Sequence, residues 1–277
     1  MNPAWTHRES PWPPLRNLTA TVLDLQPTHT FSGFTTANVT HALERLEYCQ
    51  RATRRVVSLH AYLLACGART AAEHPSVLTF RHRGRLITFD SVDVGTALNK
   101  RMPDGTWLPV IYVLREADRK SHARIQHEFR QAVRRDLTDD PAVRARRRLA
   151  GWPGWLRHWV LRRVLGNPFR LRELYGNVQL TSLYHPALQR PFAAFPPILG
   201  TVAVAAGSVA PGVVPGPGGV PVTAQLLHFG AVMNHDVIDG MAAVACVRRF
   251  LELVESGTGL DDAFIEETRA LRDQEEA

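Results

Sequence analysis

The sequence has 277 residues, of which 45% are hydrophobic and 21% are charged. A chain of this length and composition can bury a sizeable core, which excludes disorder as its main state. Its three cysteines, Cys49, Cys66 and Cys246, are too few and too scattered for a disulfide framework or a metal cage, so we expect no metal and a reducing, cytoplasmic location.

The net charge of +7 is concentrated in one segment. Residues 141–175 contain nine arginines and one acidic residue, Glu173, so the rest of the chain carries a net charge of −1. Proteins that bind nucleic acid present a basic surface together with a recognition motif. A chain that is near neutral outside one segment does not fit this description, and we expect no nucleic-acid partner.

The first half of the chain alternates irregularly between strand and helix patterns. Residues 1–15 predict an N-terminal arm with several prolines and tryptophans. Clusters of β-branched and aromatic residues between turn residues predict strands over 19–25, 30–39, 77–81, 85–89, 92–98 and 107–114. Apolar residues at helical spacing predict helices over 39–48, 56–73 and 121–136, the last with Val133 on its inward face.

The basic segment 141–175 follows as a predicted insertion. Within it, residues 152–165 place Trp155 and Trp159 near one helix face and Arg157, Leu161 and Arg162 away from that face. Aromatic and basic residues on a short helix are typical of binding to a membrane surface. The alternative is a surface helix that packs over the sheet and has solvated arginines.

The second half of the chain predicts strands over 177–183, 198–206 and 222–233. A helix over 241–255, with Val244 facing inward, and an acidic tail over 261–277 complete the chain. Strands and helices in this irregular order predict an α+β fold, a large mixed sheet covered by helices. The main folded domain is expected to run over residues 16–260.

One motif stands out near the end of the chain. His235, Asp239 and Gly240 form an H-x-x-x-D-G pattern between the last strand and the last amphipathic helix. This pattern resembles the active-site motif of chloramphenicol acetyltransferases and of the acyltransferase component of 2-oxo-acid dehydrogenase complexes. Stretches 27–46, 57–104 and 177–183 are similar to the same family in the same order, so the resemblance covers residues 20–257.

The resemblance implies a chloramphenicol-acetyltransferase-like fold, with a second short sheet that completes the large one across a homotrimer interface. It implies a coenzyme A-dependent acyltransferase in which His235 is the general base, a role that suits imidazole because it titrates near neutral pH. Thr181 is implied to donate to the oxyanion, with Ser182 as second choice. Ser182 and Gly240 are implied to bind coenzyme A. Asp239 is implied to hold the turn through an arginine.

The sequence also departs from the family. Dehydrogenase acyltransferases carry an acid before the histidine and an arginine after it, whereas Asn234 and Asp236 stand here, which leaves the partner of Asp239 open. No lipoyl-type segment is found, so we expect a stand-alone catalytic domain without covalent lipoyl. An acyl-carrier or lipoyl protein in trans is a compatible partner. A non-catalytic trimeric assembly or binding protein that retains the fold is the alternative.

Overall fold

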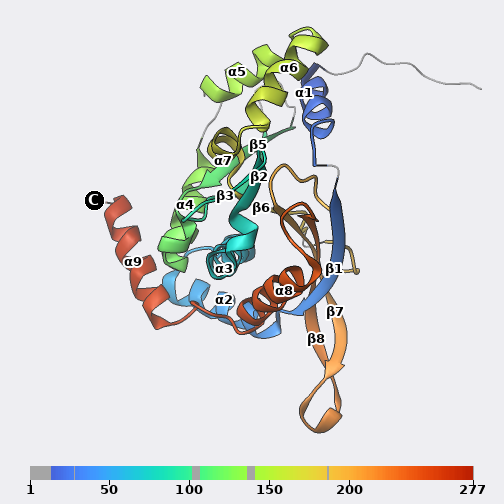
Figure 1. Ribbon diagram of the computed structural model, residues 1–277. Coiled ribbons are helices and arrows are strands. Elements are labelled where there is room, and N and C mark those ends of the chain that lie inside the picture. Colours follow the sequence, from blue (N-terminus) through green and yellow to red (C-terminus); the bar gives the residue numbers. More distant parts are fainter. Residues whose placement is uncertain (1–13, 28, 102–106, 136–140, 186, 277) are drawn as a thin grey trace, which may run out of the picture.

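The computed structural model describes residues 14–27, 29–101, 107–135, 141–185 and 187–276 (Figure 1). Its helices are α1 (Pro14–Leu23), α2 (Thr40–Thr53), α3 (Leu59–Glu73), α4 (His122–Arg134), α5 (Pro141–Ala150), α6 (Gly154–Leu165), α7 (Pro168–Tyr175), α8 (Gly240–Glu255) and α9 (Asp262–Glu276). Its strands are β1 (Thr30–Asn38), β2 (Thr79–His82), β3 (Arg85–Thr88), β4 (Val94–Arg101), β5 (Trp107–Leu114), β6 (Val178–Ser182), β7 (Val202–Pro215) and β8 (Pro221–Asn234). The predicted turn at residues 103–105 and most of the predicted arm lie outside the described residues.

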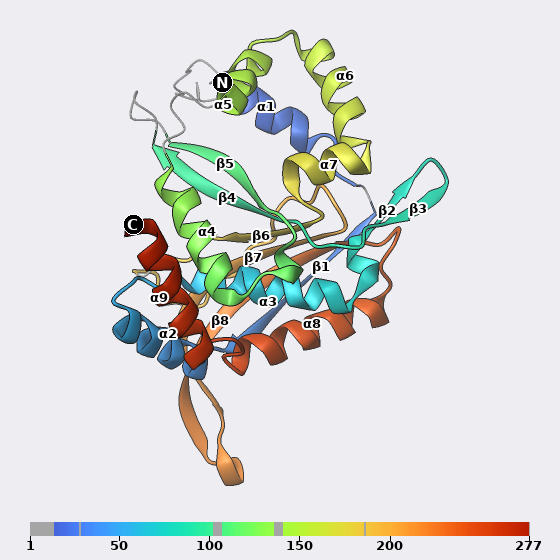
Figure 2. The ribbon, with the colours of Figure 1, turned by 90° about the vertical axis from the view of Figure 1, so that its left-hand side faces the viewer.

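A six-stranded mixed sheet in the order β1-β8-β7-β6-β4-β5 forms the centre of the molecule. β6 runs parallel to β4 and β7, and the other neighbours are antiparallel. Helices α3 and α8 cover one face of the sheet, and strands β2 and β3 form a separate hairpin (Figures 1 and 2). The structure therefore has the predicted α+β architecture, with a large mixed sheet and a second, short one.

Helix α3 lies at the centre of the core. Ser58 caps it by accepting a hydrogen bond from the Ala61 amide at 3.4 Å. Ten of its fifteen residues are buried, because a helix composed mostly of alanine and leucine can be enclosed on all sides. The sheet, α3 and α8 thus form one continuous hydrophobic core.

Three expectations about individual segments are wrong. Residues 19–25, predicted as a strand, lie mostly in α1, because packing against α5 and α6 outweighs their β-branched composition. Val133 and Val244, predicted to face inward, are exposed. In α8 the small residues Ala243 and Cys246 are buried instead, so this helix is rotated relative to the predicted face.

Helices α1, α5, α6 and α7 gather at one end of the molecule (Figure 2). Arg157, predicted to point away from the packed face, is buried there. Its guanidinium donates to Thr21 Oγ1 at 2.8 Å and to the Trp152 carbonyl at 3.0 Å. A buried arginine needs such partners to offset its desolvation, and Arg157 therefore ties α6 to α1.

The segment predicted as an acidic tail forms helix α9. Phe264, Ile265 and Leu271 are buried, and the helix packs against α2 and α4. Among the described residues, no helix combines the length and apolar character needed to cross a bilayer.

Candidate active site

His235 follows directly on the last residue of β8. Its backbone amide donates to the His29 carbonyl at 2.8 Å, which joins the turn to the segment that leads into β1. The imidazole ring is exposed and packs edge-on against Phe31, with ring centroids 5.1 Å apart. The structure thus presents the imidazole at the surface, with one side supported by an aromatic ring.

Asp236 is part of an ion-pair network beside this imidazole. Its carboxylate accepts from His29 Nδ1 at 2.9 Å and from the Arg81 guanidinium at 3.1 Å. The His29 hydrogen bond and the Arg81 charge hold the pKa of Asp236 below its usual range. The acid next to His235 is therefore engaged with His29 and with β2. Arg81 was missed in the sequence, because nothing local links the β2–β3 hairpin to the motif.

Asp239 and Gly240 begin helix α8. The Asp239 side chain accepts a hydrogen bond from the Ala242 amide at 2.9 Å, as an N-cap residue does. The partner seen here is a backbone amide instead of the arginine that the resemblance implied. An added Cβ at Gly240 would meet nothing within 4 Å, so crowding within one chain does not require glycine at this position.

Thr181 and Ser182 end strand β6 and point to opposite faces of the sheet. Val178 and Leu180 line the pocket under the helices, and successive side chains in a strand alternate. Thr181 therefore faces away from α3 and α8, whereas Ser182 shares their side. The Ser182 hydroxyl accepts from the Tyr184 amide at 3.1 Å. Of the two hydroxyls, only that of Thr181 lies on the face that α3 and α8 leave open.

The register separates Thr181 from His235 within one chain. Thr181 pairs with Ala205, and Ala205 pairs with Gly230 of β8. His235 lies five residues beyond Gly230, which corresponds to roughly 16 Å along the strand. In addition, β8 is separated sideways from β6 by the intervening strand β7. One chain therefore does not bring this hydroxyl and this imidazole together.

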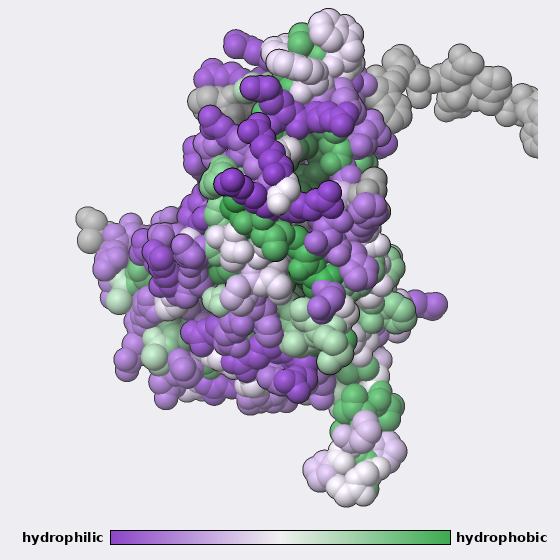
Figure 3. Space-filling view, viewed as in Figure 1, coloured by the Kyte–Doolittle hydropathy of each residue, from purple (hydrophilic) through white to green (hydrophobic). Residues whose placement is uncertain are grey.

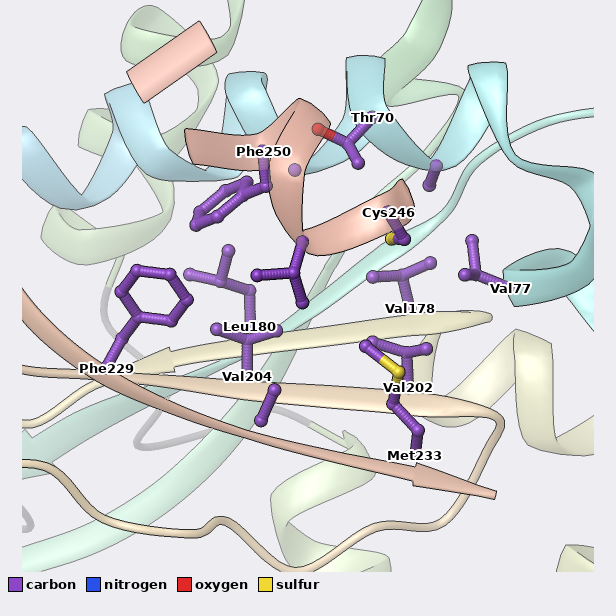
Figure 4. A pocket seen from close by; sticks show the side chains of 14 residues that line it. Thr70, Val77, Val178, Leu180, Val202, Val204, Phe229, Met233, Cys246 and Phe250 are labelled. Atoms are coloured by element: carbon purple, nitrogen blue, oxygen red, sulfur yellow. The ribbon is translucent and has the colours of Figure 1, made fainter. Parts of the chain in front are cut away.

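An apolar pocket lies between the sheet and the helices (Figure 4). It is a void of about 40 Å³, lined from α3, β6, β7, β8 and α8 by side chains such as Leu180, Phe229 and Phe250. Cys246 borders it, and burial raises the pKa of this thiol to about 11, which keeps it protonated. His235 and Thr181 are not among the lining residues, so the pocket is not the candidate active site.

The described residues contain no cluster of three or more histidine, cysteine or acidic side chains that could hold a metal ion.

No protein family model and no curated protein matches the sequence. Solved structures do match. The dihydrolipoamide acetyltransferase of Azotobacter vinelandii superposes with a TM-score of 0.67 at 19% identity, over 93% of this chain and 95% of that one. The cubic core of a pyruvate dehydrogenase multienzyme complex gives 0.65 at 18% identity, over 93% of this chain and 95% of that one.

The truncated catalytic core of the 2-oxoacid dehydrogenase complex from Thermoplasma acidophilum gives a TM-score of 0.58 at 17% identity, over 91% of this chain and all of that one. The chain has the fold of these catalytic cores. This confirms the fold that the motif at His235 implied. The match also extends over nearly the whole length of each core.

Proposed function

We propose that the protein is a coenzyme A-dependent acyltransferase, with His235 as its general base. The observation that supports this most is the position of His235 on a dehydrogenase-core fold, with its ring exposed at the end of β8. In the Azotobacter enzyme, a serine, a histidine and an asparagine have roles in the catalytic mechanism, and the asparagine stands four positions after the histidine. Asp239 stands four positions after His235, and its cap to Ala242 is one that asparagine could also make.

In the proposed reaction, His235 and the two substrates account for every bond that forms or breaks and for the transferred proton. His235 takes the proton of an acceptor thiol or hydroxyl, and the acceptor atom attacks the thioester carbonyl of the acyl-coenzyme A. The C–S bond breaks, the coenzyme A thiolate leaves, and the imidazolium returns the proton to it. Thr181 donates its hydroxyl hydrogen to the oxyanion of the tetrahedral intermediate, a contact worth about 3 kcal/mol in comparable sites. Ser182 is the alternative donor.

We further propose that the site forms between copies in a homotrimer. Thr181 and His235 are separated within one chain, so a second copy has to supply one of them. The hairpin of β7 and β8 projects from the molecule (Figures 1 and 2), and its Val213, Val220 and Val222 are exposed. The stem of the hairpin is hydrophobic, as its green colour in Figure 3 shows. Exposed apolar side chains of this kind mark an interaction surface.

An acyl-carrier or lipoyl protein acting in trans would supply a thiol to such a site. We place the protein in the cytoplasm, where thiols stay reduced, since its three cysteines are all buried and unpaired. Gly240 and Ser182 remain candidates for contact with coenzyme A.

Release of free coenzyme A from acyl-coenzyme A substrates, measured with panels of thiol and hydroxyl acceptors, tests the proposed reaction. We expect His235→Ala to lower kcat/KM by about 1,000-fold, the usual contribution of a general base. His41→Asn, which alters an exposed histidine on α2, is the control and should keep full activity. Equal activity in the wild type and in His235→Ala would refute the assigned base.

Complementation tests whether the site is shared between copies. His235→Ala and Thr181→Ala should each be nearly inactive as a homotrimer. Co-expressed, they form mixed trimers in which an intact His235 can face an intact Thr181, so activity should return. If both groups acted within one chain, mixing would restore nothing.

A further inference from the structure

Every tryptophan that the structure describes is exposed. Trp155 is 75% exposed, Trp107 67%, Trp159 59% and Trp152 43%. Tryptophan is on average a highly buried residue, because its ring carries the largest apolar area of any side chain. Three of these four lie within eight positions around the start of α6, so their exposure has a common local cause.

The cause is the way in which α6 is anchored. Arg157 and Leu161 are its buried residues, and the hydrogen bonds of Arg157 to Thr21 and to the Trp152 carbonyl fix that side against α1. Trp155 and Trp159 are spaced one helical turn apart and lie on the opposite side. The helix is thus held with its tryptophans directed outward.

Positive charge lies on the same side of the helix. Arg162 and Arg163 follow Trp159 by three and four positions and are exposed, which places them one turn further along the exposed stripe. The prediction that Arg162 lies away from the tryptophans is therefore wrong, because residues three positions apart share a helix face. No acidic side chain of the described residues forms an ion pair with either of them. The exposed stripe of α6 consists of Trp155, Trp159, Arg162 and Arg163, and we call it the α6 stripe.

The neighbouring helix α7 is engaged within the molecule. Phe169 is 58% exposed, but its ring packs edge-on against Phe89, with centroids 5.6 Å apart. Arg170 beside it forms an ion pair with Glu173 at 2.7 Å. The α5–α7 end of the molecule is a convex tip (Figures 1 and 2) with a surface of mainly hydrophilic and intermediate residues (Figure 3). The aromatic rings and positive charges available to a partner at this end are therefore those of the α6 stripe.

We propose that the α6 stripe docks the protein on the surface of an anionic lipid bilayer. Indole rings favour the region between headgroups and acyl chains, because one part of the ring is apolar and its N–H is a donor. Arginine binds lipid phosphates through its planar set of donors. A convex tip with two outward tryptophans suits a deformable surface that accepts inserted rings, and the proposal is independent of the acyltransferase chemistry.

Co-sedimentation of the full-length protein with phosphatidylcholine vesicles, with and without phosphatidylglycerol, tests this proposal. We expect binding only to the anionic vesicles, and binding that weakens as salt rises. Arg162→Gln with Arg163→Gln should lower the partition coefficient roughly 30-fold, since each arginine near an anionic surface contributes about 1 kcal/mol to the binding free energy. Arg51→Gln with Arg248→Gln removes the same charge from α2 and α8 and should change binding little.

Tryptophan insertion is tested separately with vesicles whose acyl chains carry bromine, which quenches only indoles that enter the bilayer. Trp155→Ser with Trp159→Ser should lose this quenching and bind about tenfold more weakly. Tyr48→Ser, an exposed aromatic residue on α2, is the matched control. Circular dichroism of each variant checks that the fold is kept.

Equal binding to neutral and anionic vesicles, or no binding at low salt, would overturn the proposal. The same holds if both tryptophan substitutions leave binding unchanged. Binding to an acidic polypeptide in solution that exceeds binding to anionic vesicles would assign the α6 stripe to an acidic protein instead. Each of these results leaves the release of coenzyme A unaffected, so the proposed enzyme function is judged independently.

Discussion

At the scale of the single residue, Asp236 ties the turn that carries His235 to two neighbouring segments. Its carboxylate joins His29, whose carbonyl holds the His235 amide, to Arg81 on the β2–β3 hairpin. The turn is therefore supported from two sides by groups that do not touch the imidazole. Asp236 is a positioning residue in the proposed reaction.

Asp236→Asn should lower kcat roughly tenfold, because loss of the ion pairs lets the imidazole shift, and small displacements of a catalytic group are costly. The thermal midpoint should change little, since exposed ion pairs contribute only about 0–1 kcal/mol. Both quantities are measured on the same preparation. Glu47→Gln, which removes the exposed partner of Arg51, is the control. A drop in stability without a drop in kcat would show that the network serves folding only.

At the scale of the element, β4 meets the end of α7 at very short range. Asp93, just before β4, accepts from Arg115 at 2.9 Å and from Arg172 of α7 at 2.8 Å. Burial alone would raise the pKa of Asp93, but hydrogen bonds from Arg172, the Glu116 amide and Arg115 hold it below its usual range. The basic segment 141–175 is thus bound to the sheet by a buried carboxylate.

Gly95 lies at the point of closest approach. A Cβ there would lie 1.8 Å from the Tyr175 carbonyl oxygen, so Gly95→Ala would push the backbones of β4 and α7 apart. We expect a loss of about 2–3 kcal/mol in the free energy of unfolding, measured by urea titration. Gly33→Ala in β1, where nothing lies within 4 Å, should be neutral or slightly stabilising. Equal effects of the two substitutions would contradict the close contact.

At the scale of the whole molecule, we expect stability to depend on pH through the half-buried His60 and the buried His122. Burial lowers the pKa of His60 to about 4. Burial, aided by Arg69 and opposed by Asp261, lowers that of His122 to about 4. One ring nitrogen of each has no hydrogen-bond partner among the described residues. A proton added to either ring would therefore be a buried, poorly compensated charge.

The unfolded chain binds these protons near pH 6.5, whereas the folded chain binds them only near pH 4. The stabilisation is therefore complete above about pH 6.5 and is lost as the pH falls from there toward about 4. The urea midpoint should fall between about pH 7 and about pH 5, and His60→Asn with His122→Asn should flatten this dependence. His41→Asn should retain it. A midpoint that is independent of pH over this range would refute the prediction.

In the proposed trimer, the projecting β7–β8 hairpin makes activity depend on the association of the copies. Val213→Lys with Val222→Lys should dissociate the proposed trimer, because buried lysines would lose hydration at the interface. Coenzyme A release should disappear in parallel, since Thr181 and His235 lie apart within one chain. Light scattering measures the mass, and Val56→Lys, at another strongly exposed valine, is the control. A variant that stays active as a monomer would refute the shared site.

Local patterns predicted much of this molecule, and their failures have a common reason. β1, the β2–β3 hairpin, β6 and α8 were predicted near their observed positions, because alternation, helical spacing and turn residues act over a few positions. Residues 19–25 failed, because a helix with partners in α5 and α6 outweighed their strand composition. Arg157 failed for the same reason, since its partner Thr21 lies 136 positions away.

The family resemblance carried by the H-x-x-x-D-G pattern predicted the fold. The same pattern and its neighbouring elements predicted the place of His235 between β8 and α8, because these signals are local. Three features became visible in the assembled fold alone: Asp236 pairs with Arg81 across 155 positions, Thr181 faces the open side of the sheet, and Thr181 lies far from His235 in one chain. These features depend on strand order and register. They arise from contacts between distant segments, which no local pattern encodes.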